Sequence, residues 1–111
     1  MTAVSLRTPQ NVGTRDMVRE WLGREAPAEL SGRTVQVDCS PLRALTPSFL
    51  DEMLKILVLE RCATRVELRH ASDRAKALAT RSAQNRKIVA RIDFVEDAPQ
   101  TWLHRLRGVA R

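Results

Sequence analysis

Ser48, Asp38, His70 and His104 supply the residue types of a hydrolase triad. In such a triad a histidine takes the proton of the serine, and a carboxylate orients the histidine. The sequence contains no G-x-S-x-G pattern, which marks the strand-to-helix turn that exposes the serine in many hydrolases. We therefore expect that these residues do not form a catalytic site and that the protein is not an enzyme.

The sequence also lacks the residue patterns of a carboxylate-pair site, a metal site and a nucleotide-binding site. Asp51 and Glu52 are adjacent and point about 100° apart on a helix, so they cannot flank one substrate, and a solvated helix face explains them better. His70 with Cys62 or Asp73 lacks a close metal-ligand spacing such as C-x-x-C or H-x-x-x-H. The glycine-rich loops that hold nucleotide phosphates are missing. We expect neither a metal nor a cofactor.

Length and composition indicate one folded domain, residues 1–111. Of the residues, 43% are hydrophobic and 29% are charged, which is close to the globular average. The two cysteines, Cys39 and Cys62, are too few for a disulfide framework. No apolar run approaches the roughly 18 residues needed to cross a bilayer, and residues 1–10 do not resemble a signal peptide. We expect a cytoplasmic protein with no membrane partner.

The net charge of +6 is concentrated in residues 61–91, which hold nine basic and two acidic side chains. A solvated, arginine-rich helix face explains this segment. The alternative is binding of nucleic acid or another polyanion, since clustered basic side chains attract phosphates. The segment has no aromatic residue, which excludes base stacking there and makes nucleic acid the less favoured partner. The candidate polyanion-binding residues are Arg65, Arg69, Arg74, Arg81, Arg86 and Lys87.

Hydrophobic periodicity predicts alternating strands and helices. Residues 2–7, 34–39 and 64–70 alternate as strands do, whereas helical spacing runs from 14 to about 24, from 48 to about 61, and after Ser72. The strand-helix-strand unit between Val35 and Leu68 requires a parallel crossover, which favours an α/β fold. A last helix is expected around Trp102, and its apolar face offers a contact for a homodimer.

The start of the central helix has two interpretations. Thr46 as N-cap with Pro47 at the first helical position is one. Ser48 as N-cap with Asp51 three residues later is the other. The sequence does not choose between them.

Residues 35–54, V-Q-V-D-C-S-P-L-R-A-L-T-P-S-F-L-D-E-M-L, carry a family resemblance together with G-T-R before the first helix and V-E-L-R-H-A-S before the third. The chain resembles the STAS-like domain family of unknown function, which is related to bacterial anti-sigma-factor antagonists. The resemblance covers about residues 12–91 and leaves 92–111 as a C-terminal extension with a short helix. It implies a mixed sheet of about four strands, backed by three to four helices.

The resemblance also implies a regulator that docks to another protein, either a histidine-kinase-like ATPase or an anti-sigma factor. In the similar antagonists, an Asp-Ser-Ser-Gly type motif before the helix carries a phosphorylated serine. Here the direct match puts Pro47 at that serine, and a shift of one residue puts Ser48 there. Ser48 and Thr46 are therefore candidate phosphoacceptors, although a role as helix caps explains both.

From these observations we expect docking through residues 40–51. A phosphate at a helix N-terminus adds about −1.5 to −2 charge and can block an interface there. Charged residues beside the helix start would steer the partner. The candidate partner-binding residues are Arg43, Thr46, Pro47, Ser48, Phe49 and Asp51.

Overall fold

The computed structural model describes residues 3–43 and 45–95. Strands and helices alternate along this part of the chain, as the hydrophobic periodicity predicts. The elements are β1 (Val4–Arg7), α1 (Arg15–Glu25), β2 (Thr34–Asp38), α2 (Pro47–Leu54), a π-helical segment (Lys55–Glu60), β3 (Arg65–Arg69), α3 (Asp73–Arg86), a 3-10 turn (Val89–Arg91) and β4 (Ile92–Val95).

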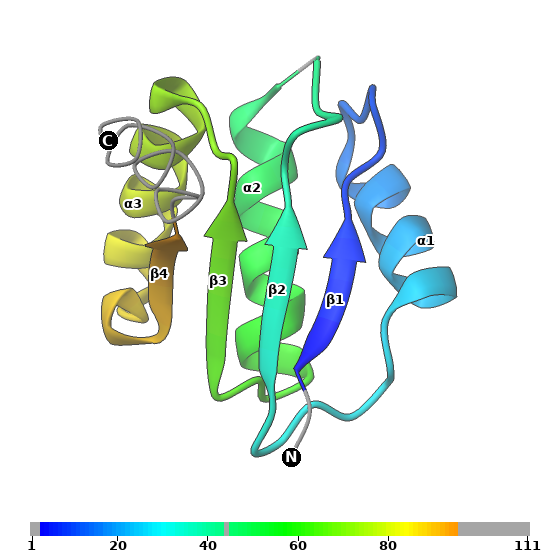
Figure 1. The fold of residues 1–111 in the computed structure, drawn as a ribbon, viewed down its shortest axis with the longest axis vertical. Coiled ribbons are helices and arrows are strands. Elements are labelled where there is room, and N and C mark those ends of the chain that lie inside the picture. Colours follow the sequence, from blue (N-terminus) through cyan, green and yellow to red (C-terminus); the bar gives the residue numbers. More distant parts are fainter. Residues whose placement is uncertain (1–2, 44, 96–111) are drawn as a thin grey trace, which may run out of the picture.

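The sheet has the order β1-β2-β3-β4, and its three neighbouring pairs are parallel. Each parallel pair needs a crossover, and α1, α2 and α3 provide one each. Crossovers of the same hand between successive strands leave all three helices on one face of the sheet. Figure 1 shows this helix layer behind the sheet, with α2 between α1 and α3. The central helix α2 therefore contacts both of its neighbours.

The core lies between the sheet and the helix layer. Buried apolar residues alternate with more exposed polar ones along β2 and β3, so only one side of the sheet faces the core. The other side is a polar surface. There Gln36 Nε2 donates to Glu67 Oε1 at 3.0 Å, and Arg65 pairs with Asp93.

The predicted fold class is confirmed, since the described chain forms one α/β domain with four strands backed by helices. The three pairs of neighbouring strands are parallel, whereas the resemblance implied a mixed sheet, and an isolated antiparallel bridge joins Ser31 and Ala63 outside these strands. Ile92–Val95 forms β4, so the sheet includes the first residues of the expected C-terminal extension. The predicted helix around Trp102, with its dimer contact, lies outside the described residues. Within the described residues, no helix has the length and apolar character needed to cross a bilayer.

Candidate functional site

The loop between β2 and α2 lies at the carboxyl edge of the sheet. Asp38, the last residue of β2, accepts a hydrogen bond from Ser40 N at 2.9 Å. The backbone N–H of Cys39 donates to Arg69 O at 2.9 Å, and that of Arg43 donates to Gln10 O at 2.8 Å. Asp38 therefore orders the loop, and the Arg43 side chain extends from it into solvent.

Thr46 is the N-cap of α2. Its Oγ1 accepts a hydrogen bond from Phe49 N at 3.2 Å and donates to Gly13 O at 3.5 Å. Pro47 occupies the first turn, where its missing N–H is not needed. Of the two predicted helix starts, the one with Thr46 as N-cap is therefore confirmed. The contact with Gly13 also ties the start of α2 to the loop before α1.

Replacing Thr46 by alanine is expected to lower the free energy of unfolding by about 1 kcal/mol, the usual effect of losing a side-chain N-cap. Thr46→Ser keeps the oxygen that accepts from Phe49 N and should change it by less than half as much. Urea unfolding followed by circular dichroism measures both variants. An equal decrease in the free energy of unfolding of the two variants would show that the threonine methyl group matters, and not the cap.

Phe49 belongs to the core. Its side chain is fully buried and stacks on Trp21, with ring centroids 5.9 Å apart. A partner cannot reach this ring, so Phe49 is not a contact residue, in contrast to the sequence-based expectation. The helical stripe that contains Phe49 faces the sheet and α1. Pro47 is exposed and Ser48 half-buried, so these two residues form the accessible part of the first turn.

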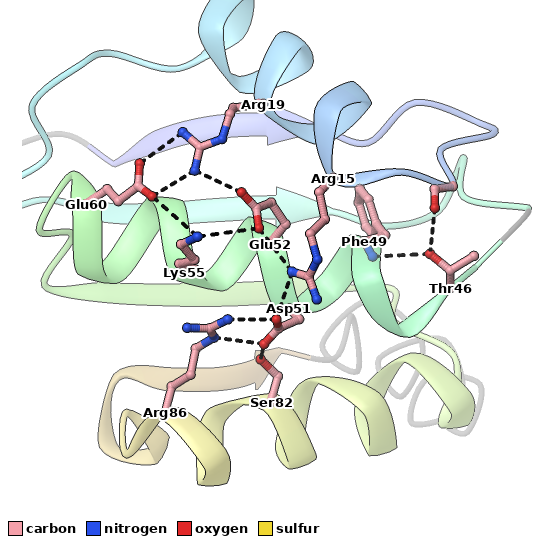
Figure 2. Close-up of polar contacts among 11 residues, drawn as sticks. Arg15, Arg19, Thr46, Phe49, Asp51, Glu52, Lys55, Glu60, Ser82 and Arg86 are labelled. Atoms are coloured by element: carbon pink, nitrogen blue, oxygen red, sulfur yellow. Dashed lines mark hydrogen bonds and ion pairs between the residues drawn. The ribbon is translucent and has the colours of Figure 1, made fainter.

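Asp51 joins α2 to α3 and α1 (Figure 2). Its Oδ1 accepts from Ser82 Oγ at 2.8 Å and from Arg86 Nε at 2.8 Å. Its Oδ2 accepts from Arg86 at 2.7 Å and from Arg15 at 2.9 Å. Hydrogen bonds from Arg86 are the main reason that the pKa of Asp51 lies well below its usual range. Partial burial acts in the opposite direction and is outweighed. Asp51 was expected to steer a partner, but its charge is already neutralised within the domain.

Glu52 is buried, with a relative exposure of 2%, and it faces α1. Its carboxylate receives hydrogen bonds from Arg15 at 3.0 Å and Arg19 at 2.9 Å, and the Lys55 ammonium lies 3.8 Å away. Arg19 also bonds Glu60 at 2.8 Å, at the end of the π-helical segment. The expected solvated face for Asp51 and Glu52 is therefore wrong, because α2 packs between two helices that supply cations.

Sequence reasoning missed the two arginines of α1 in this network. Arg15 and Arg19 are four residues apart, which places them on one face of a helix. That spacing was the available signal, but nothing local shows that a carboxylate 33 or more residues later faces them.

Ser48 lines a groove of about 240 Å³ between the first turn of α2 and α3. Arg81 and Asn85 of α3 line the same groove, and so does Arg15 of α1. Within the described chain, the Ser48 hydroxyl has no hydrogen-bond partner, whereas the Thr46 hydroxyl is used twice. The two candidate hydroxyls thus differ in availability.

A second cavity, of about 350 Å³, lies between the β2–α2 loop and the start of α3. Arg43 and Arg74 line it, together with Ser72, the N-cap of α3, and the apolar Leu42. The two arginines come from different elements and give this edge of the domain a positive charge. The β2–α2 loop therefore borders this cavity, and the first turn of α2 borders the groove, and each of the two is lined by two arginines.

The residues of the arginine-rich segment do not form one surface. Arg65 and Arg69 extend from the polar side of β3, whereas the other candidates lie in the helix layer, on α3 or, for Lys87, at its C-cap. Arg65 pairs with Asp93 and Arg86 with Asp51. Because the sheet separates the two groups, the set expected to bind a polyanion cannot contact one ligand as a unit. The exposed members of the α3 group are Arg74, Arg81 and Lys87.

Those residues of the hydrolase and metal hypotheses that the structure describes do not assemble into one site. Asp38 and His70 line one cavity, and Ser48 lines another to which no described histidine contributes. His104 is outside the described residues. The described residues also contain no group of three histidine, cysteine, aspartate or glutamate side chains placed to hold a metal ion.

Comparisons with family models, curated proteins and solved structures found no match to this chain.

Proposed function

We propose that the protein is a non-enzymatic interaction module, similar to anti-sigma-factor antagonists, that docks to a protein partner through the β2–α2 loop and the first turn of α2. The observation that carries this proposal is the combination of a fixed backbone and exposed side chains. Thr46 and the buried Phe49 fix the helix start, while Arg43, Pro47 and Ser48 remain accessible. Such preorganisation reduces the entropy lost on association.

Ser48 is the favoured phosphoacceptor in this proposal. Thr46 Oγ1 serves as N-cap and bonds Gly13, so phosphorylation of Thr46 would disrupt the start of the helix. The Ser48 hydroxyl is partnerless in the described part of the chain and half-exposed. A phosphate there would lie in the first turn of α2, where the helix dipole favours negative charge, and would cover the docking surface.

The partner that the STAS-like resemblance suggests is a histidine-kinase-like ATPase or an anti-sigma factor. A sheet backed by helices on one face agrees with the architecture that the resemblance implies. Arg43 and Arg74 line the cavity beside the loop, and Arg81 lines the groove. These positive charges favour a partner surface rich in carboxylates.

Reversing the charge of Arg43, or adding one at Ser48, is expected to weaken partner binding at least tenfold without unfolding the protein. Affinity purification from the native host with the wild-type chain would identify proteins that Arg43→Glu and Ser48→Asp fail to retain. Titration calorimetry with the purified partner then gives the affinities. The matched control is Arg24→Glu, since Arg24 is exposed in the last turn of α1, away from the loop.

Unchanged affinity in both Arg43→Glu and Ser48→Asp would contradict the proposal. An equal loss of affinity in Arg24→Glu would show that net charge, and not the loop, determines binding. Circular dichroism of each variant confirms that the fold persists.

A further inference from the structure

The groove between α2 and α3 has apolar and polar walls. Pro47 and Leu78 form the apolar part. The polar part comes from all three helices and includes Arg15, Ser48 and Arg81. Its volume of about 240 Å³ is below the roughly 300–1,000 Å³ typical of small-molecule pockets. The groove is therefore suited to one side chain more than to a whole metabolite.

Several side chains in the groove carry hydrogen-bond donors that no described residue engages. The side chains of Ser48, Arg81 and Asn85 have no hydrogen-bond or ion-pair partner in the described parts of the chain. Arg15 uses a single nitrogen, Nη1, for both Asp51 and Glu52, so its remaining guanidinium N–H groups are not engaged by described residues. Four side chains thus present donors to the same space. An acceptor group with a negative charge would satisfy them.

Asp51 also lines the groove, but it does not oppose an incoming anion strongly. Both of its oxygens accept hydrogen bonds, Oδ1 from Ser82 and Arg86 and Oδ2 from Arg86 and Arg15. Arg86 alone compensates its charge through a bidentate contact. The charge of Arg81 remains uncompensated among the described residues and gives the groove a net positive potential.

We propose that this groove binds the carboxylate of an aspartate or glutamate side chain that a partner protein inserts when it docks. Arg81 and Arg15 supply charged donors, Ser48 and Asn85 supply neutral donors, and Pro47 and Leu78 contact the methylene groups. The inference rests on the proposed function, because the groove adjoins the first turn of α2. Planar guanidinium groups recognise a carboxylate better than a spherical anion.

The test uses a capped tripeptide with a central glutamate, acetyl-Ala-Glu-Ala-amide, in an amide-detected NMR titration of the full chain. We expect shifts confined to the amides that surround the groove, including those of Ser48 and Ser82. The same peptide with glutamine in place of glutamate should produce no such shifts. Free glutarate is the third probe, and it should bind more weakly than the glutamate peptide because it lacks backbone contacts.

Arg81→Gln is expected to weaken glutamate-peptide binding about tenfold, as expected for loss of a charged hydrogen-bond donor. The control is Arg24→Gln, which removes the same charge from an exposed position in the last turn of α1, outside the groove, and should change the affinity less than twofold. Equal weakening by the two variants, or no localised shifts in the wild type, would overturn the proposal. If glutarate binds as tightly as the peptide, the groove is a site for a free acid, and the proposal that the carboxylate comes from a partner protein is overturned.

This result is separable from that of the docking proposal. If Arg43→Glu abolishes partner capture while Arg81→Gln leaves peptide binding unchanged, the loop docks a partner but the groove does not receive its carboxylate. If the peptide binds the groove and partner capture ignores Arg43 and Ser48, the loop proposal fails while the carboxylate site remains.

Discussion

Phe49→Ala should lower the free energy of unfolding by about 4 kcal/mol, within the range for deleting a fully buried aromatic ring. The ring is inaccessible to solvent and stacks on Trp21, so its removal leaves a cavity between α2 and α1. Urea denaturation followed by circular dichroism measures the change. This is the largest effect we expect from a single substitution.

Phe49→Leu provides the control, since it keeps most of the buried volume and should lower the free energy of unfolding by less than half as much. It also separates packing from docking. If Phe49 acts only in the core, Phe49→Leu retains full partner affinity. A loss below 1 kcal/mol in Phe49→Ala would contradict the buried position of the ring, and a loss of affinity in a stable Phe49→Leu would restore it as a contact residue.

Asp51→Asn is expected to lower the free energy of unfolding by about 2 kcal/mol at neutral pH, because Arg86, Arg15 and Ser82 lose a charged acceptor. The effect should depend on pH. The pKa of Asp51 is lowered in the folded protein, so the unfolded chain binds more protons in acid. The stabilisation is complete above the unfolded pKa of about 4 and is lost as the pH falls below it.

Urea unfolding at pH 7, 5, 4 and 3 tests this prediction. The wild-type protein should lose more stability between pH 5 and pH 3 than Asp51→Asn does. Asp16→Asn is the control, since Asp16 is exposed in the first turn of α1 and forms no ion pair with another described residue. Identical acid dependence in wild type and Asp51→Asn would show that the carboxylate is not held by its arginines.

Local patterns in the sequence determined the order of elements and most of their positions. Strand alternation around Val35 and Val66 depends on neighbours within a few residues, so both strands could be predicted directly. A parallel crossover then required an α/β fold. The same reasoning located the start of α2, although it left the choice between Thr46 and Ser48 as N-cap to the contact with Gly13 and to Phe49 N.

Tertiary structure alone decided the roles of Asp51 and Glu52. Their 100° separation on the helix correctly excludes a shared substrate, and it also directs one toward α3 and the other toward α1. Their partners on those helices lie 31 to 37 residues away in the chain, and no local signal specifies such pairs. Charged residues this far apart in the sequence come together only when the sheet and the helix layer pack. The sequence therefore shows the charges but not their pairing.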